Sequence, residues 1–172
     1  GNPLEGQAGA LAEVWSLGHR NVQGLAFRPG TDDLYISEMG PRGGDEINLI
    51  LPGRNSGWPV VSYGEEYSGM RVGQGIAQME GMEEPVYYWD PVIAPSGIAF
   101  GEGGMFPEWE GSLFVGGLAG SHISRLVIED GRVTGEERLL ESERQRFRDV
   151  AFGPDGTLYA VTDAGRLYRV FR

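Results

Sequence analysis

One hairpin unit occurs three times along the chain, and this repeat restricts the fold more than any other feature of the sequence. The unit begins with GLAF at Gly24, GIAF at Gly97 and DVAF at Asp149. A turn and a second apolar run follow each time, and these second runs are LYISE from Leu34, LFVGG from Leu113 and LYAVTD from Leu158. The turns RPGTDD and GPDG suit tight reversals, because proline presets φ and glycine accepts a positive φ. The repeat therefore predicts antiparallel hairpins.

The spacing of these units is typical of β-propeller blades, in which about 40–50 residues form four strands. The first unit is longer, and an insertion at residues 62–85 accounts for the excess. Residues 137–147, ERLLESERQRF, offer one short helical candidate, although RLL fits an outer strand equally well. Residues 12–18, AEVWSLG, are expected to form an outer strand of a preceding blade. We therefore predict an all-β chain with about three blades of a β-propeller.

The composition excludes several classes of protein. A chain of 172 residues with 40% hydrophobic composition can bury a core. The formal net charge of -11 argues against a nucleic-acid partner, because phosphate binding needs clustered lysine and arginine. No apolar run of about 18 residues could span a bilayer, and no basic-then-apolar leader opens the sequence. The absence of cysteine excludes disulfides and thiolate chemistry.

Arginines precede two of the three repeated runs. GHRNVQGLAF contains Arg20 and Asn21, and RQRFRDVAF contains Arg146 and Arg148. In a propeller these positions lie near the central channel, where they can meet a ligand. Arg146 and Arg148 are two residues apart, so an extended chain points both the same way and Phe147 the opposite way. Such a pair suits an anion with several carboxylates, because guanidinium binds carboxylate in a bidentate fork; salt bridges to acids of the chain are an equal alternative.

The turn EMGPRGGDE at residues 38–46 has two interpretations. Calcium takes six to eight oxygen ligands, and carbonyls near Gly40 and Pro41 together with the Glu46 carboxylate could supply several of them. The alternative is a β-turn in which Asp45 caps local N–H groups. The sequence lacks the ligand order of an EF-hand, so both interpretations stay open.

The histidines and the aromatic cluster carry weaker signals. His19 and His122 lie in no nucleophile elbow or zinc spacing, and we expect His19 to be a packed or hydrogen-bonding residue. The cluster PVYYWDP at residues 85–91 is first a packing feature, and its rings could also line a sugar site.

Taken in order, these motifs resemble one family. GHRNVQGLAF, EMGPRGGDEINLI, GRNSGWPVVSYGEEYSG, EPVYYWDPVIAPSGIAF, GSLFVGGL and RQRFRDVAFGPDGTLYAVTD are similar to the C-terminal half of the soluble quinoprotein aldose sugar dehydrogenases, the glucose/sorbosone dehydrogenase family. The resemblance implies a six-bladed β-propeller that binds pyrroloquinoline quinone (PQQ) and calcium in its channel. It also implies oxidation of aldoses at C1 to lactones, an external electron acceptor and a periplasmic or secreted location.

The resemblance assigns roles to particular residues. The positions that match the family's quinone contacts are Arg20, Asn21, Tyr67, Gly117, Leu118, Ala119, Arg146 and Arg148. Gly40 and Pro41 match the carbonyls that bind the quinone-linked calcium, whereas Glu46 and Ser56 match ligands of a further calcium.

The sequence departs from the family pattern in three respects. RNVQG replaces the usual RNPQG, and Ala119 stands where many members have a cofactor-binding lysine. No residue here matches the family's general-base histidine, which belongs to the N-terminal half, so no catalytic residue is assigned and the chain alone is expected to be inactive. Three units cannot close a six-bladed ring, so we expect either a missing N-terminal half or pairing with a second copy.

Two rival functions remain open. One is a non-enzymatic propeller that binds sugar or protein and has lost the quinone, for which Ala119 is the best indication. The other is a lactonase-like or scaffold propeller that uses calcium alone.

Overall fold

The computed structural model describes all residues, 1–172, and its strands form three antiparallel sheets. The first sheet contains β1 (Val22–Phe27), β2 (Leu34–Glu38), β3 (Asp45–Ile50) and β4 (Tyr87–Trp89). The second contains β5 (Pro95–Phe100), β6 (Leu113–Gly117), β7 (Ile123–Glu129) and β8 (Arg132–Leu139). The third contains β9 (Phe147–Phe152), β10 (Leu158–Thr162) and β11 (Leu167–Val170). Two short 3-10 helices, η1 (Pro107–Trp109) and η2 (Glu141–Glu143), complete the elements.

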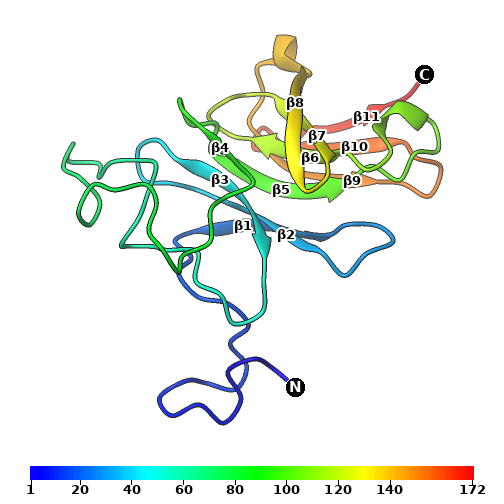
Figure 1. The fold of residues 1–172 in the computed structure, drawn as a ribbon. Helices are drawn as coiled ribbons and strands as arrows, with labels where there is room; N and C mark the ends of the chain where they lie inside the picture. The colour runs from blue at the N-terminus through cyan, green and yellow to red at the C-terminus, as the bar shows by residue number, and fades with distance from the viewer.

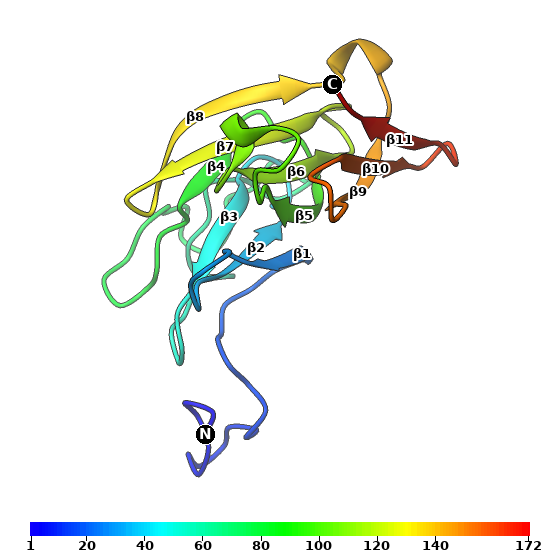
Figure 2. The ribbon, with the colours of Figure 1, turned by 90° about the vertical axis from the view of Figure 1, so that its right-hand side faces the viewer.

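The sheets follow one another as successive blades of a partial β-propeller (Figure 1, Figure 2). Within each sheet, consecutive strands pair in sequence order, and the three predicted hairpins are β1–β2, β5–β6 and β9–β10. Strand β1 packs beside β5, and β5 beside β9, so the first strands of the blades lie together. The prediction of an all-β partial propeller is confirmed.

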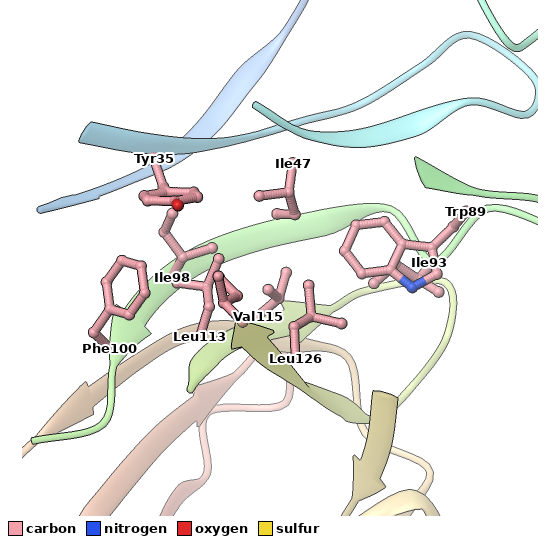
Figure 3. Close-up of a cluster of buried hydrophobic side chains, with 10 residues drawn as sticks. Tyr35, Ile47, Trp89, Ile93, Ile98, Phe100, Leu113, Val115 and Leu126 are labelled. Atoms are coloured by element: carbon pink, nitrogen blue, oxygen red, sulfur yellow. The ribbon is translucent and has the colours of Figure 1, made fainter. Parts of the chain in front are cut away.

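Two apolar clusters join neighbouring blades. Tyr35 and Ile47 of the first sheet pack against residues of the second, including Ile98 and Leu113, in the cluster shown in Figure 3. The second cluster lies between the second and third sheets and includes Phe114 and Phe147. The alternation of the strands explains this arrangement, because one side of each blade faces the blade before it and the other faces the blade after it.

The repeat provides a comparison between covered and free blade faces. Leu25, Ile98 and Val150 occupy the same position of the repeated run, and their exposed fractions are 59%, 7% and 4%. Leu25 is exposed because the chain places no blade before the first sheet. Phe27 and Phe100 differ in the same way, at 61% and 5%.

One expectation about secondary structure was wrong, and one pair of alternatives is decided by the structure. Residues 12–18 form no strand; Leu17 makes only an isolated parallel bridge to Asn55, since the chain holds no preceding sheet with which this segment could pair. Of the two alternatives for residues 137–147, the structure shows the outer strand: β8, the last strand of its sheet, continues through Leu139, and only the single turn η2 follows before β9 begins.

The predicted insertion lies in the connection from β3 to β4, and the aromatic cluster includes β4, the outer strand of the first blade. No strand lies between Ile50 and Tyr87, so residues 62–85 belong to one long connection between β3 and β4. Trp89 is buried in the first apolar cluster, as packing required, whereas Tyr88 stacks on Tyr63 with ring centroids 4.1 Å apart. None of the helices is long and apolar enough to cross a membrane.

Candidate functional site

Arg20 lies just before β1, and residues at the end of β2 hold it in place. Its backbone N–H donates to the Glu38 carboxylate. Its Nη1 donates to the carbonyl oxygens of Met39, at 2.9 Å, and Gly40, at 3.1 Å. The structure therefore brings Arg20 and Gly40, which the sequence separates, into direct contact.

Aromatic rings from the insertion side flank the Arg20 guanidinium. Its carbon lies 5.2 Å from the Trp58 ring centroid and 5.8 Å from that of Tyr67, within cation–π range. Tyr67 is 73% exposed, so most of its surface is free to contact a ligand. Asn21 is exposed beside Arg20, and its side-chain oxygen accepts a hydrogen bond from Gln23 at 2.7 Å.

A small acidic cavity lies directly behind Arg20. Its volume of about 20 Å³ is enough for about one water-sized occupant. Its lining includes Gly18, Arg20, Glu38, Gly40, Glu46 and Ser56. Three of the four predicted calcium-site residues, Gly40, Glu46 and Ser56, thus line one cavity, and Glu38 lines it with them.

Glu46 faces Glu38 across the β2–β3 pair. Burial, together with the neighbouring Glu38 and Asp45, raises the pKa of Glu46 to about 7, against a lowering hydrogen bond from Asn48 at 3.2 Å. Two close carboxylates out of water are unfavourable when both are charged, and a cation between them would relieve this cost. The cavity therefore fits a cation.

The donor set limits how such a cation could be held. No group of three or more His, Cys, Asp or Glu side chains forms a metal-binding cluster. Calcium in the acidic cavity would thus need hydroxyl, carbonyl or water oxygens beside the carboxylates, which calcium accepts readily.

Asp45 has a structural role at the glycine turn. Its carboxylate accepts hydrogen bonds from the N–H groups of Gly40 at 3.0 Å, Ile93 at 2.9 Å and Ala94 at 2.7 Å. The expected capping of local N–H groups by Asp45 is confirmed, and the same side chain also ties this turn to the start of the second blade. Burial raises the pKa of Asp45 despite these hydrogen bonds. Pro41 lies buried in the same turn.

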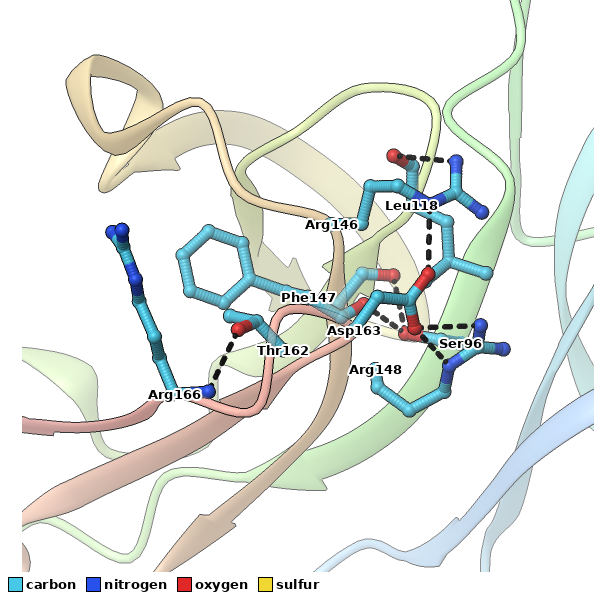
Figure 4. Close-up of polar contacts among 9 residues, drawn as sticks. Ser96, Leu118, Arg146, Phe147, Arg148, Thr162, Asp163 and Arg166 are labelled. Carbon is cyan, nitrogen blue, oxygen red and sulfur yellow. Dashed lines mark hydrogen bonds and ion pairs between the residues drawn. The ribbon is translucent and has the colours of Figure 1, made fainter.

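Arg146 and Arg148, here called the arginine pair, converge on a single carboxylate (Figure 4). The Nε atoms of both arginines donate to Asp163, each at 2.8 Å, and Arg148 Nη2 lies 2.7 Å from the same carboxylate. Phe147 between them is fully buried on the opposite side, as the spacing predicted. Salt bridging within the chain, the alternative left open by the sequence, is what the structure shows. Hydrogen bonds from the arginine pair lower the pKa of Asp163.

The loop after β6 borders the arginine pair. Arg146 Nη1 donates to the Leu118 carbonyl at 3.2 Å, so the predicted 117–119 segment and the arginine pair form one group. Gly117 and Leu118 are buried, whereas Ala119 is exposed and contributes no charge. No hydrogen bond joins this group directly to Arg20 and the acidic cavity; the site has two halves, on different blades.

Both histidines are hydrogen-bonding residues. His19 Nδ1 lies 3.1 Å from Glu38 and its Nε2 lies 2.7 Å from Ser16 Oγ, as expected for a residue held in place. His122 is buried; its Nδ1 donates to the Gly120 carbonyl at 2.8 Å and its Nε2 lies 3.1 Å from Ser124 Oγ.

Three residues of the site were missed by sequence reasoning, namely Glu38, Trp58 and Asp163. Glu38 stands at the start of the glycine turn, directly after the apolar run LYIS, and this position was an available signal. Asp163 ends the third LYAVTD run, but nothing local distinguishes it from the other acids of the chain.

The fold and these two halves define a class of protein: a partial β-propeller with arginines where its inner strands begin and buried carboxylates beside the glycine turn. Comparison with known proteins narrows this class, because the sequence profile described as Glucose / Sorbosone dehydrogenase matches residues 1–169. The chain belongs to the glucose/sorbosone dehydrogenase family.

Individual relatives agree with this assignment. Over 172 residues the chain is 42% identical to the aldose sugar dehydrogenase YliI of Escherichia coli, covering 98% of this chain and 46% of that protein. A crystal structure of a glucose dehydrogenase superposes with a TM-score of 0.94 at 47% identity, covering 99% of this chain and 50% of the other. The PQQ-bound aldose sugar dehydrogenase of Streptomyces coelicolor superposes with a TM-score of 0.71 at 32% identity, covering 99% and 48%. The chain thus spans about half the length of the relatives it matches.

Proposed function

We propose that this chain is part of a PQQ- and calcium-dependent sugar dehydrogenase that oxidises aldoses at C1 to lactones and delivers electrons to an external acceptor. The observation that carries the proposal is the arginine pair, whose guanidinium groups both bind one carboxylate within 2.8 Å. PQQ is a tricarboxylate, and planar guanidinium groups are suited to such anions. A relative that is 32% identical and PQQ-bound supports the same cofactor.

The residues of this chain would bind and orient the quinone. In the proposal, Arg146 and Arg148 hold its carboxylates beside Gly117, Leu118 and Ala119. Arg20, Asn21 and Tyr67 contact it from the first blade.

Calcium is proposed at the glycine turn, where Gly40 and Pro41 offer carbonyls, and in the acidic cavity with Glu46 and Ser56. The Gly40 carbonyl accepts from Arg20, and its second lone pair can still face a cation. When bound, the quinone accepts hydride from the sugar, and calcium polarises its carbonyl.

The chain supplies only part of the ring in this proposal. Three further blades, from a preceding half of a longer protein or from a second copy, would cover the free faces at Leu25 and Val161. The general base would come from the preceding half, because a second copy of this chain has no matching histidine either. The proposed location is periplasmic or secreted.

A second candidate is a propeller that has lost the quinone and binds sugar or protein without catalysis. The observation that favours it is Ala119, which is exposed at the position of the family's cofactor-binding lysine and adds no positive charge there.

Titration of the 172-residue chain with PQQ, with and without calcium, tests the proposal. We expect calcium-dependent changes in the quinone spectrum and in Tm, both lost in Arg146→Ala and Arg148→Ala. Arg169→Ala is the matched control, because Arg169 lies in the same sheet with an ion pair of its own, 3.8 Å from Asp155. Sedimentation of the same samples reports whether the 18.7 kDa chain associates with a second copy.

Absence of binding well above micromolar quinone would contradict the proposal for this chain and favour the second candidate. Sugar-dependent dye reduction by the isolated chain would contradict the assignment of the general base to the other half.

A further inference from the structure

Asp163 sits between the two arginines rather than beside one of them. It follows β10 directly, and its two carboxylate oxygens take one Nε–H each, from Arg146 and from Arg148. Figure 4 shows the carboxylate enclosed by the two guanidinium groups. A carboxylate has two oxygens and about four acceptor sites, so it can serve both partners at once.

The backbone around Asp163 is also fixed. The Asp163 N–H donates to the Arg146 carbonyl at 3.1 Å. The preceding Thr162 is buried, and its N–H donates to the Arg166 carbonyl at 3.0 Å, which closes the turn into β11. The carboxylate is thus held by the sheet, and the half-exposed arginines are fixed to it.

This arrangement determines which arginine donors are left for a ligand. Asp163 binds the Nε–H groups of both arginines and Nη2 of Arg148, and the Leu118 carbonyl accepts from Arg146 Nη1. Two nitrogens, Arg146 Nη2 and Arg148 Nη1, therefore have no protein partner. Side chains of arginine lose considerable rotamer freedom when they bind, and a partner that orders them beforehand reduces that loss on binding.

We propose that Asp163 is a positioning residue that pre-orders Arg146 and Arg148 for an anionic cofactor. This inference rests on the proposed function only for the identity of the ligand. Two effects of Asp163 on the affinity for an anion have opposite directions. By electrostatics alone, its negative charge would weaken anion binding, whereas its ordering of the two arginines strengthens anion binding, and we expect the second effect to be larger.

The test compares Asp163→Asn with Asp155→Asn. Both changes remove one negative charge from an aspartate that pairs with arginine in the third blade, but Asp155 lies in the turn at the other end of β9–β10. An Asn at 163 keeps the shape but has an NH2 donor in place of one acceptor oxygen, so one of the two arginines loses its acceptor. We expect the PQQ Kd, measured in calcium-containing buffer, to rise at least fivefold in Asp163→Asn and to stay within twofold in Asp155→Asn.

A spectroscopic readout separates positioning from the proposed function. In the ligand-free protein, the Nε–H signals of Arg146 and Arg148 in nitrogen-15 NMR spectra should exchange slowly with water and collapse to rapid exchange in Asp163→Asn. Equal or tighter PQQ binding by Asp163→Asn, with Tm unchanged, would overturn the inference. If the wild type binds no PQQ, the proposed function fails, and the NMR spectra alone decide the positioning claim. Nε–H signals of Arg146 and Arg148 that are the same in Asp163→Asn as in the wild type would overturn that claim as well. Signals that collapse to rapid exchange in Asp163→Asn would support it.

Discussion

Replacing Glu46 with glutamine should change how the stability of the metal-free protein depends on pH. Burial beside Glu38 and Asp45 raises the pKa of Glu46 from its ordinary value of 4.5 to about 7. Between these two values the folded protein keeps a proton that the unfolded chain has lost, so the free energy of unfolding falls as pH rises through this window. Above about pH 7 the loss is complete, and below about pH 4.5 it is absent.

The magnitude follows from the two pKa values. The interval from 4.5 to about 7 corresponds to about 3 kcal/mol, at about 1.4 kcal/mol for each pH unit. Glu46→Gln removes the titration and keeps an acceptor oxygen for Asn48, whose side chain donates to Glu46 at 3.2 Å. The variant should therefore be more stable than the wild type at pH 8, by up to about 3 kcal/mol, and by less than about 1 kcal/mol at pH 5.

The assay is urea unfolding at pH 5 and pH 8 with a calcium chelator present. Glu129→Gln, at an exposed glutamate of β7, is the matched control and should show the wild-type pH dependence. Equal pH dependence in Glu46→Gln and the wild type would refute the reasoning. A second series with calcium at about 100 times its Kd should stabilise the wild type at pH 8 by about 2.7 kcal/mol, and Glu46→Gln should lose this gain.

The remaining predictions concern packing. Ile98→Ala should cost about 2–5 kcal/mol because Ile98 is buried between blades. Leu25→Ala, at the same repeat position but 59% exposed, should cost less than about 1 kcal/mol. Denaturation of both variants at low protein concentration measures the two costs. Equal costs would mean that another molecule covers the face of the first blade at Leu25. Tyr35→Phe removes a buried hydroxyl that has no hydrogen-bond partner, so Tm should stay the same or rise, by an amount equivalent to about 1 kcal/mol. A clear fall in Tm would show that the hydroxyl is satisfied.

The hairpins could be predicted from the sequence because their determinants are local. The run from Gly24 to Phe27, the turn RPGTDD and the run from Leu34 contain both strands and their connection within one short segment. The pairing β1–β2 follows directly, since Phe27 lies opposite Leu34. The segment 12–18 was predicted wrongly because its pattern specifies a strand but cannot specify the neighbour that a strand needs.

The candidate site was less predictable because its contacts are not local. The spacing of Arg146 and Arg148 correctly placed both side chains on one side of the strand, but 25 acids were available to them. Asp163, 15 residues beyond Arg148, is brought there by the β9–β10 pairing, which includes a register shift at Val161 and Thr162. Sequence periodicity does not reveal such a shift, so the partner of the arginine pair could be found only in the structure.

The two halves of the site are connected through the second blade. Ser37 Oγ in β2 donates to the Ser96 carbonyl at 2.6 Å, and Ser96 Oγ donates to the Phe147 carbonyl at 2.7 Å (Figure 4). All three residues are buried, and Phe147 separates Arg146 from Arg148 in the chain. Buried hydrogen bonds of this kind resist displacement, since breaking one leaves a polar group unsatisfied away from water. The strand that ends in the Glu38 turn and the strand that holds the arginine pair are therefore fixed relative to each other, so a ligand bridging both halves would meet donors and acceptors that are already in place.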